Sequence, residues 1–219
     1  GSGNDSLSGG DGNDSLSGGA DNDTLTGGLG DDTFRIGAET DSIRDLGNGS
    51  DVLVVSSGAT VTATLAQNWT ATSSSSNAGT ANLINAGYNV NLSAASGDIG
   101  WSVTNDGNGT AVTLTGSAYA DTLIGGDGAD SLSGGGGDDS LDGGVGDDTL
   151  IGGGGNDRFN ISAGTDSITD LGNGSDVLVV SSGATADATL SAAWTATSDS
   201  RNNGSAYLTA AGHSVNLAA

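Results

Sequence analysis

The chain has 219 residues and a formal net charge of −23, because 27 acidic residues stand against only four basic ones. This acidity excludes nucleic acid as an expected partner, since phosphate groups would be repelled, and it argues against binding to an anionic membrane surface. No run of about 18 apolar residues occurs, so we expect no insertion into a membrane. The absence of cysteine excludes disulfide and thiol chemistry.

Glycine-rich acidic sequences are often disordered tails, and the 41 glycines of this chain raise that alternative. The placement of the apolar residues argues against it. Leu123, Leu132, Leu141, Leu150 and Phe159 follow one another at a strict spacing of nine residues. A fixed short period of this kind indicates a solenoid rather than a disordered segment.

Residues 1–51 begin with nonapeptides and end in an acidic loop. One nonapeptide is GGDGNDSLS, residues 9–17, and the next two occupy residues 18–26 and 27–35. The first six residues of a unit are rich in glycine and aspartate and favour turns, whereas the last three favour a short strand with its apolar residue facing inward. Two units, about 18 residues, would then complete one coil with a strand on each side.

Residues 52–115 are poor in charge and rich in Ser, Thr, Ala, Val and Asn. The alternating stretches predict short strands, namely DVLVV (51–55), TVTATL (60–65), YNVNL (88–92) and TAVTLTG (110–116). LAQNW (65–69) is compatible with a single helical turn. The sequence leaves two arrangements open: these segments either extend the solenoid or pack on it as a sandwich.

Residues 116–176 repeat the first block, and residues 177–219 repeat residues 52–94, at a constant offset of 125 residues. Residues 41–58 match residues 166–183 at all positions but one. We interpret the chain as a piece of a longer tandem array. A natural end after a partial duplication is the alternative.

The nonapeptides place an aspartate at a fixed position, so stacked coils would stack carboxylates. Neighbouring strands lie about 4.8 Å apart, and two carboxylates at that distance repel by roughly 1 kcal/mol in water and about 3 to 4 kcal/mol at an effective dielectric near 20. A cation between coils would reverse the sign. The available ligands are carboxylate and carbonyl oxygens, since His213 is the sole imidazole and there is no thiol. Oxygen ligands in flexible turns favour calcium over zinc, copper or magnesium.

The units resemble GGxGxDxUx, the nonapeptide of the RTX (repeats-in-toxin) family, over residues 1–35 and 116–160. The resemblance implies an all-β fold, a right-handed parallel β-roll or β-solenoid whose GGxGxD turns hold calcium through carbonyls and aspartate side chains. Carried over by position, the implied ligands are Asp5, Asp14, Asp23, Asp32, Asp121, Asp130, Asp139, Asp148 and Asp157. Asp21 and Tyr119 replace a motif glycine, so we expect weaker binding at those turns.

The nine-residue spacing continues one step beyond the glycine motif, to Asp41 and Asp166. Pairing aspartates 18 residues apart gives 5–23, 14–32, 23–41, 121–139, 130–148, 139–157 and 148–166. The pairs predict roughly seven calcium ions or more, and seven ions would reduce the formal charge to about −9.

The loop DLGNGSD follows each nonapeptide block, at 45–51 and 170–176. The family resemblance implies that it closes the roll and adds a metal site, with Asp45, Asp51, Asp170 and Asp176 as candidates. An ordinary Asn-Gly turn with solvated acids is the alternative. The predicted organisation is thus a first RTX roll with its closing loop (1–51), a β segment (52–115), a second roll with its loop (116–176) and a second β segment (177–219).

Other residues give no sign of catalysis. Trp69 and Trp194 recur at the common offset, which favours a packing role over sugar stacking. One histidine cannot support a Ser/His/Asp arrangement, and the acids are explained by metal binding. Outward rows of Ser and Thr resemble ice-binding faces, but they equally suit a soluble sheet surface.

The sequence therefore predicts a non-enzymatic, calcium-binding structural module of a secreted bacterial cell-surface protein, an S-layer, filament or adhesin stalk. The family resemblance implies an extracellular location and export by type I secretion. Expected partners are further copies of the repeat or other subunits, with a cell-surface glycan as a third alternative. The rival prediction is an accessory RTX module that helps a secreted enzyme or toxin to fold and be exported.

Overall fold

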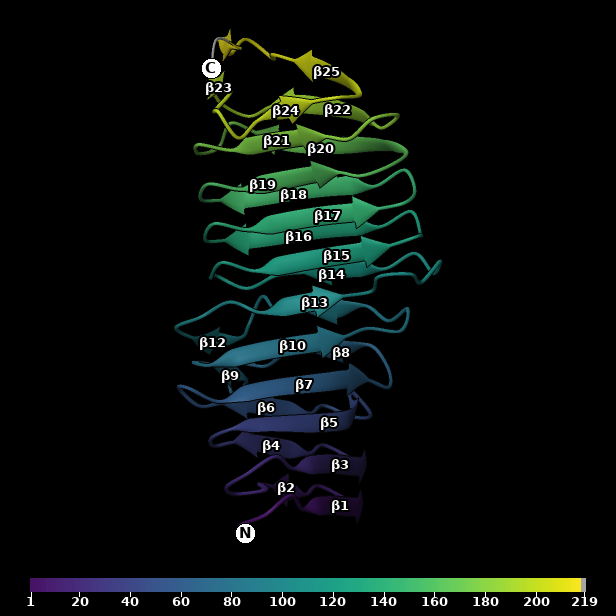
Figure 1. Cartoon of the computed structure of the whole chain (residues 1–219), viewed down its shortest axis with the longest axis vertical. Coiled ribbons are helices and arrows are strands. Elements are labelled where there is room, and N and C mark those ends of the chain that lie inside the picture. Colours follow the sequence, from purple (N-terminus) through teal and green to yellow (C-terminus); the bar gives the residue numbers. More distant parts are fainter. Residues whose placement is uncertain (218–219) are drawn as a thin grey trace. The chain divides into compact units, whose positions relative to one another are not determined.

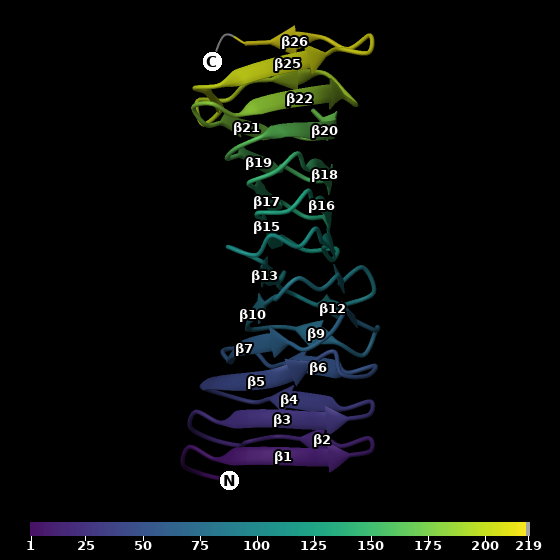
Figure 2. The ribbon, with the colours of Figure 1, turned by 90° about the vertical axis from the view of Figure 1, so that its right-hand side faces the viewer.

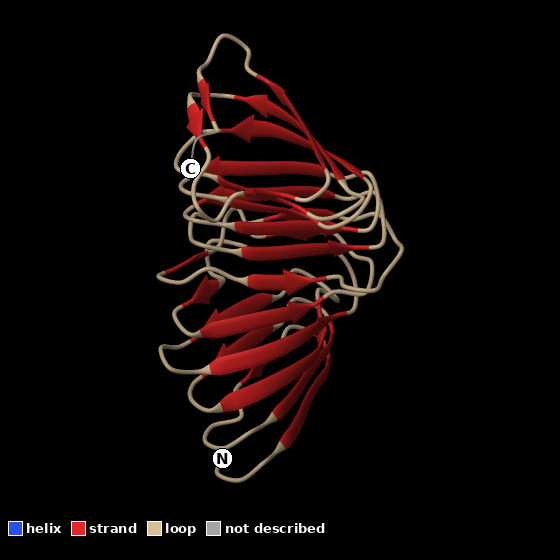
Figure 3. Ribbon diagram, turned by 45° about the horizontal axis from the view of Figure 1, so that its top comes forward, coloured by secondary structure: helices blue, strands red, loops and turns tan. Residues whose placement is uncertain are grey.

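The computed structural model describes residues 1–217, and the chain divides into two compact units, Gly1–Thr104 (unit 1) and Asn105–Ala219 (unit 2). Every regular element of the described residues is a β-strand (Figure 3). Residues 1–217 contain no helix of the length and apolarity needed to cross a membrane. The predicted all-β solenoid is confirmed.

In unit 1 successive coils stack along the unit, with strands on its two sides (Figures 1 and 2). One sheet contains, in order, β1 (Ser6–Asp11), β3 (Thr24–Leu29), β5 (Thr40–Leu46), β7 (Thr60–Leu65), β10 (Thr80–Ile84) and β13 (Ser102–Thr104). The other contains β2 (Ser15–Leu16), β4 (Thr33–Ile36), β6 (Val52–Val55), β9 (Ser76–Asn77) and β12 (Ser96–Gly97). β8 (Trp69–Thr70) pairs with β11 (Val90–Asn91). The pairs within unit 1 are parallel.

Unit 2 repeats this arrangement. One sheet contains β15 (Thr122–Gly126), β17 (Ser140–Gly144), β19 (Arg158–Ile161), β21 (Val177–Val180) and β24 (Arg201–Asn202). The other contains β14 (Thr113–Thr115), β16 (Ser131–Gly136), β18 (Thr149–Gly154), β20 (Thr165–Leu171), β22 (Thr185–Leu190) and β25 (Ser205–Thr209). β23 (Trp194–Thr195) pairs with β26 (Val215–Asn216), also in parallel.

The strand register confirms that two nonapeptides form one coil. Ser6 pairs with Thr24, and Ser131 pairs with Thr149, a separation of 18 residues in both units. Beyond the nonapeptides the coil becomes longer, since Thr60 pairs with Thr80 at a separation of 20. The structure thus decides between the two arrangements left open by the sequence: the segments after each nonapeptide block extend the solenoid and do not form a sandwich.

The core of each unit is the column of inward-facing apolar residues. The predicted inward residues of unit 2, from Leu123 to Phe159, are fully buried. Each such side chain contributes about 1.5 to 3 kcal/mol by leaving water. The helical turn considered at LAQNW does not form, because β7 ends at Leu65 and β8 begins at Trp69. The coils pack closely on one another, and several turn glycines lie where a side chain would clash with the next coil.

Most strands of the nonapeptide blocks are longer than the three residues that the sequence predicted, although β2 has only two. β16 runs from Ser131 through the first glycines of the next turn to Gly136. Gly134 lies so close to the next coil that a Cβ there would approach the Gly152 carbonyl oxygen to 2.6 Å and the Asp139 Oδ2 atom more closely still. This glycine is therefore required by the approach of two coils, whereas Gly135, at φ +106°, is required by the turn itself.

We expect Gly134→Ala to lower the free energy of unfolding by about 1 to 3 kcal/mol, because the added methyl overpacks the gap between coils. Gly154→Ala is the matched control, since a Cβ at Gly154 would have no atom within 4 Å. Urea unfolding in calcium, followed by circular dichroism, measures both. Equal stability of the two variants would contradict the close packing described above.

Candidate metal centre

The aspartates at the nine-residue spacing form one column on each side of a unit, directly before a strand or, for Asp41 and Asp166, at its second residue. We call this set the ladder aspartates: Asp5, Asp14, Asp23, Asp32, Asp41, Asp121, Asp130, Asp139, Asp148, Asp157 and Asp166. From Asp121 to Asp166 they are at most 3% exposed. Asp5 and Asp14, in the first coil of unit 1, are more exposed. Buried carboxylates in columns need compensation, since the 27 acids far outnumber the four basic residues.

In most of these carboxylates one oxygen accepts a hydrogen bond from the neighbouring coil. The amide of Asp130 donates to Oδ1 of Asp148 at 2.7 Å, and the amide of Asp139 donates to Oδ1 of Asp157 at 3.0 Å. The same bond joins Asp5 to Asp23, Asp14 to Asp32, Asp23 to Asp41, Asp121 to Asp139 and Asp148 to Asp166. The structure therefore brings together all seven pairs that the sequence predicted.

The second oxygen is the unusual feature of the ladder. Buried Oδ2 atoms without a hydrogen-bond partner belong to Asp14, Asp23, Asp41, Asp130, Asp139, Asp148 and Asp166. Buried polar atoms in folded proteins are nearly always paired, so a repeated unpaired oxygen indicates a group that pairs with it.

The first glycine of each turn permits the close approach of these oxygens to the backbone, because it carries no side chain. A Cβ at Gly9 would lie 2.5 Å from Asp14 Oδ2 and 2.6 Å from the Gly27 carbonyl oxygen. At Gly125 the corresponding atoms are Oδ2 of Asp130 and the carbonyl oxygen of Gly143. A carboxylate oxygen and a carbonyl oxygen from the next coil thus converge on a point that no side chain fills.

This donor set fits a calcium ion. Calcium binds carboxylate and carbonyl oxygens in irregular arrangements, at about 2.3 to 2.6 Å. Within residues 1–217 no three His, Cys, Asp or Glu side chains gather as metal ligands, so backbone carbonyls must complete any set. That composition matches calcium and does not match the nitrogen and sulfur sets of zinc.

Burial and repulsion change the acidity of the ladder. The pKa of Asp139 is raised from 3.8 to about 7, chiefly by burial and also by the charges of Asp121 and Asp157, against the opposing hydrogen bond from the Asp121 amide. Burial likewise raises the pKa of Asp166 to about 7, and the pKa values of Asp148 and Asp157 to about 6. Below these pKa values the four carboxylates of Asp139, Asp148, Asp157 and Asp166 bind protons in the metal-free chain.

Asp51 and Asp176 extend the ladder, whereas the sequence assigned them to a separate loop. The Asp32 amide donates to Oδ1 of Asp51 at 2.9 Å, and the Asp157 amide donates to Oδ1 of Asp176 at 3.0 Å. Each pair is separated by 19 residues instead of 18. A search of the sequence for the same period with one inserted residue would have placed these two candidates in the ladder. Their Oδ2 atoms accept from the amides of Gly47 and Gly172, so the loop itself partly satisfies them.

Asp45 and Asp170 have a different environment. The two oxygens of Asp45 accept from the amides of Gly27 and Gly28, at 2.9 and 2.8 Å. Asp170 accepts from Gly152 and Gly153 in the same way. The structure thus gives these two carboxylates a role in closing the roll over its last glycine pair. Their role as metal ligands stays a prediction.

The two turns with a substituted glycine keep their hydrogen bonds. Asp21 adopts a left-handed φ of 73°, which aspartate tolerates, and its Oδ2 accepts from the Gly3 amide at 2.8 Å. At the other turn the Tyr119 amide donates to the Ser117 hydroxyl at 3.2 Å, and that hydroxyl donates to Asp121 Oδ2. The weaker binding expected at these turns stays a prediction.

Comparison with known families identifies the nonapeptides. The family model of the RTX calcium-binding nonapeptide repeat matches four times, at residues 1–34, 106–141, 115–150 and 133–168. The chain carries RTX calcium-binding repeats. No match was found among curated proteins or among solved structures.

In these RTX repeats a bound calcium ion would neutralise the carboxylates and link one coil to the next. The residues that would hold it are the ladder aspartates, through Oδ2, and the glycine carbonyls of the following coil, such as those of Gly27 and Gly143. From Asp130 to Asp166, the hydrogen bonds at Oδ1 orient the carboxylates and leave Oδ2 to bind the ion.

We expect Asp139→Asn to remove about one to two bound calcium ions per chain, because an amide oxygen is a weaker ligand than a carboxylate. Asp138→Asn is the matched control: it removes the same charge from the adjacent, exposed position, where Oδ1 accepts from the backbone amide and from Nδ2 of Asn156. Equilibrium dialysis with metal analysis gives the stoichiometry. Equal losses in the two variants would show that total charge, not the ladder, sets the stoichiometry.

The raised pKa values also predict the pH dependence of the metal-free chain. Asp139 and Asp166 have an ordinary pKa of 3.8 and a folded value of about 7, so the folded ladder binds protons that the unfolded chain has released. The resulting stability is complete below the ordinary value and is lost as the pH rises through the folded one. Circular dichroism of chelated samples should show more β-structure at pH 4 than at pH 8. Calcium binding should weaken on acidification and release protons in a weakly buffered solution.

Proposed function

We propose that the chain is a calcium-dependent structural module of a secreted bacterial cell-surface protein, such as an S-layer, filament or adhesin stalk. The RTX match establishes a calcium-binding repeat module, and the row of unpaired, buried Oδ2 atoms is the observation that carries the proposed mechanism. In this mechanism repulsion between ionised carboxylates keeps the coils of the metal-free chain apart. Extracellular calcium binds these carboxylates and allows the coils to pack.

A mechanical rather than catalytic role follows from how the acids are used. Each ladder carboxylate binds the amide of the neighbouring coil and faces another oxygen, which positions it for a cation and not for a substrate. His213, the sole imidazole, lies on an exposed turn. The solenoid in turn suits a spacer, because each coil adds length by the same contacts as the one before.

The tandem period supports membership of an extended array. Thr40 pairs with Thr60 in unit 1, and Thr165 pairs with Thr185 in unit 2, so the two copies fold with one register. A protein built from many such copies would form a stalk or a surface lattice. Its expected partners are further copies of the repeat or other subunits, and a cell-surface glycan is a further candidate.

Export as an unfolded chain by type I secretion fits this chemistry. The cytoplasm is poor in free calcium, so the ladder would stay repulsive until the chain reached the outside. RTX repeats are typical of proteins exported in this way, and that association equally supports the second candidate, an accessory module of a secreted enzyme or toxin. A catalytic domain in the parent protein would favour the second candidate, and many 125-residue copies would favour the first.

Chelation should unfold most of the chain, because the glycine-rich coils have little core to offset their conformational entropy. We expect the β-type circular dichroism spectrum to collapse with excess chelator and to return with millimolar calcium, but not with equal magnesium. Size-exclusion chromatography should show a matching expansion and compaction. A compact β-structure that persists in chelator at pH 8 would contradict the proposed mechanism.

A further inference from the structure

The first coil of unit 2, residues 105–121, treats its ladder carboxylate differently from the coils that follow it. In those coils the buried Oδ2 atoms without a hydrogen-bond partner belong to Asp130, Asp139, Asp148 and Asp166. Asp121 is buried as deeply, at 2% exposed, but its Oδ2 atom accepts two hydrogen bonds from Ser117. The protein itself thus supplies at this turn what the later turns lack.

Both donors come from one residue, four positions before the carboxylate. The Ser117 amide donates to Asp121 Oδ2 at 2.5 Å, and the Ser117 hydroxyl donates to the same oxygen at 2.9 Å. The hydroxyl accepts from the Tyr119 amide at 3.2 Å, which leaves its own hydrogen directed toward Asp121. Because a carboxylate oxygen offers about two lone pairs, a cation could bind this Oδ2 only by displacing a donor.

The surroundings of Asp121 otherwise match those of the later turns. A Cβ at Gly116 would lie 2.6 Å from Asp121 Oδ2 and closer still to the carbonyl oxygen of Gly134 in the next coil. The Asp121 amide donates to Oδ1 of Asp139 at 2.7 Å, as the other ladder amides do. A carboxylate oxygen and a carbonyl oxygen therefore converge here too, and the difference lies in Ser117.

Ser117 stands at the second glycine of the motif. The glycines at this place in the next four turns have φ between 98° and 112°, and they are Gly126, Gly135, Gly144 and Gly153. Ser117 does not adopt a positive φ, which is unfavourable for a residue with a Cβ. The turn consequently takes a different path, with the amide and the hydroxyl of Ser117 both directed at the carboxylate.

The other column of this coil also begins with uncharged groups. Val112 lies one coil before Asp130, and its amide donates to Asp130 Oδ1 at 2.7 Å. The Gly125 carbonyl, one coil before that of Gly143, accepts from Nδ2 of Asn105 at 2.7 Å. An amide donor thus lies at the carbonyl that, one coil later, faces a carboxylate oxygen.

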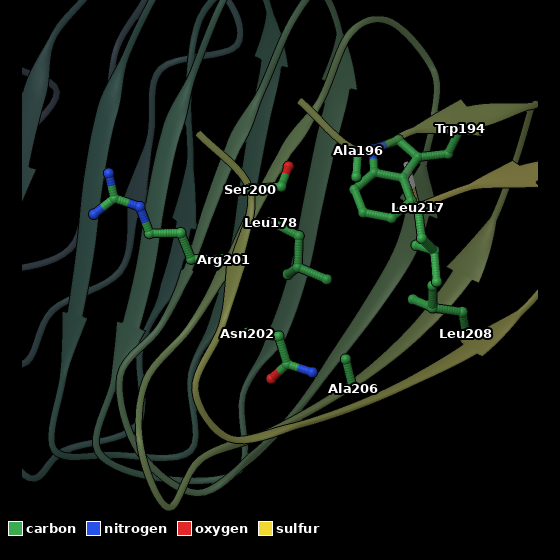
Figure 4. A pocket seen from close by; sticks show the side chains of 9 residues that line it. All are labelled: Leu178, Trp194, Ala196, Ser200, Arg201, Asn202, Ala206, Leu208 and Leu217. Carbon is green, nitrogen blue, oxygen red and sulfur yellow. The ribbon is translucent and has the colours of Figure 1, made fainter. Parts of the chain in front are cut away.

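The last carboxylate of the same nonapeptide block is satisfied in a related way. The Gly172 amide donates to Asp176 Oδ2 at 2.7 Å, again from four positions before. The indole N–H of Trp194 donates to the Asp176 carbonyl oxygen at 2.9 Å, and Figure 4 shows this indole beside Leu217, among the residues that line an apolar cavity of about 270 Å³. Hydrogen-bonded carboxylates therefore lie at both ends of the block, and the unpartnered ones lie between them.

We propose that Ser117 takes the place of a calcium ion at the Asp121 turn, so that the coil of residues 105–121 binds no ion. Ser117 thereby sets the turn at which calcium binding begins in this block, a role that rests on the calcium-dependent mechanism proposed above. A coil whose polar groups are satisfied without calcium offers the next coil a finished surface on which to order.

The calcium stoichiometry of the full chain tests this role, measured by equilibrium dialysis with metal analysis. Asp121→Asn should leave the number of bound ions unchanged, because this carboxylate binds none, whereas Asp139→Asn should lower it. The asparagine keeps a side-chain oxygen for the two donors of Ser117, so the turn retains its hydrogen bonds. Loss of an ion in the Asp121→Asn chain would overturn the proposal.

Ser117→Gly is the complementary variant, since it restores the motif glycine and removes the hydroxyl. It should raise the stoichiometry by about one ion per chain, and Asp121→Asn added to it should remove that ion again. Tyr119 can remain, because Gly128, at its place in the Asp130 turn, does not have a positive φ either. Ala118→Gly is the matched control: it adds the same backbone freedom to the adjacent, exposed residue and should leave the count unchanged.

Circular dichroism in calcium establishes that each variant is folded. An unchanged count in a folded Ser117→Gly chain would overturn the proposal, and a lower count would also overturn it, since Ser117 would then itself be a calcium ligand. These outcomes leave calcium binding by the later turns intact. A parent chain that binds no calcium at all would instead contradict the proposed function and the role of Ser117 together.

Discussion

The ladder carboxylates bind the neighbouring coil with one oxygen, while the other oxygen is buried without a hydrogen-bond partner in seven of them, and the rest of the solenoid depends on this division. Oδ1 accepts an amide from 18 residues earlier, as Asp148 does from Asp130. Oδ2 then faces a carbonyl of the next coil, where only glycine leaves room. The sequence needs aspartate, because a longer side chain at this position would fill the gap that the cation requires.

In the coils outside the nonapeptides, neutral asparagine side chains take the buried polar positions. There the buried polar residues include Asn77 and Asn105, and the side-chain amide of Asn105 donates to the Gly125 carbonyl at 2.7 Å. An asparagine supplies both a donor and an acceptor, so it bridges two coils with no net charge. The chain thus alternates coils with buried aspartates and coils with buried asparagines, and the buried aspartates lie in two blocks, residues 1–51 and 116–176.

The sequence predicted the coil length, the inward apolar residues and the seven aspartate pairs, because all three follow from one strict period. It did not predict that Asp51 pairs with Asp32, or that Asp45 binds the amides of Gly27 and Gly28. Both depend on an irregular register between Ile43 and Leu46, where the last nonapeptide coil joins a longer one. The longer coils were likewise undecided, since their strands alternate in the same way in a solenoid and in a sandwich.

Each candidate calcium site takes its oxygens from two successive coils. At Gly125, for example, these are Asp130 Oδ2 and the carbonyl oxygen of Gly143. An isolated nonapeptide therefore offers no complete site, and the first ion can be captured only after two coils have come together. Each later coil then needs only to dock on a finished neighbour. Such a one-dimensional arrangement makes ordering cooperative and lets it spread from a nucleus along the chain, so longer arrays would respond to calcium more steeply than short ones.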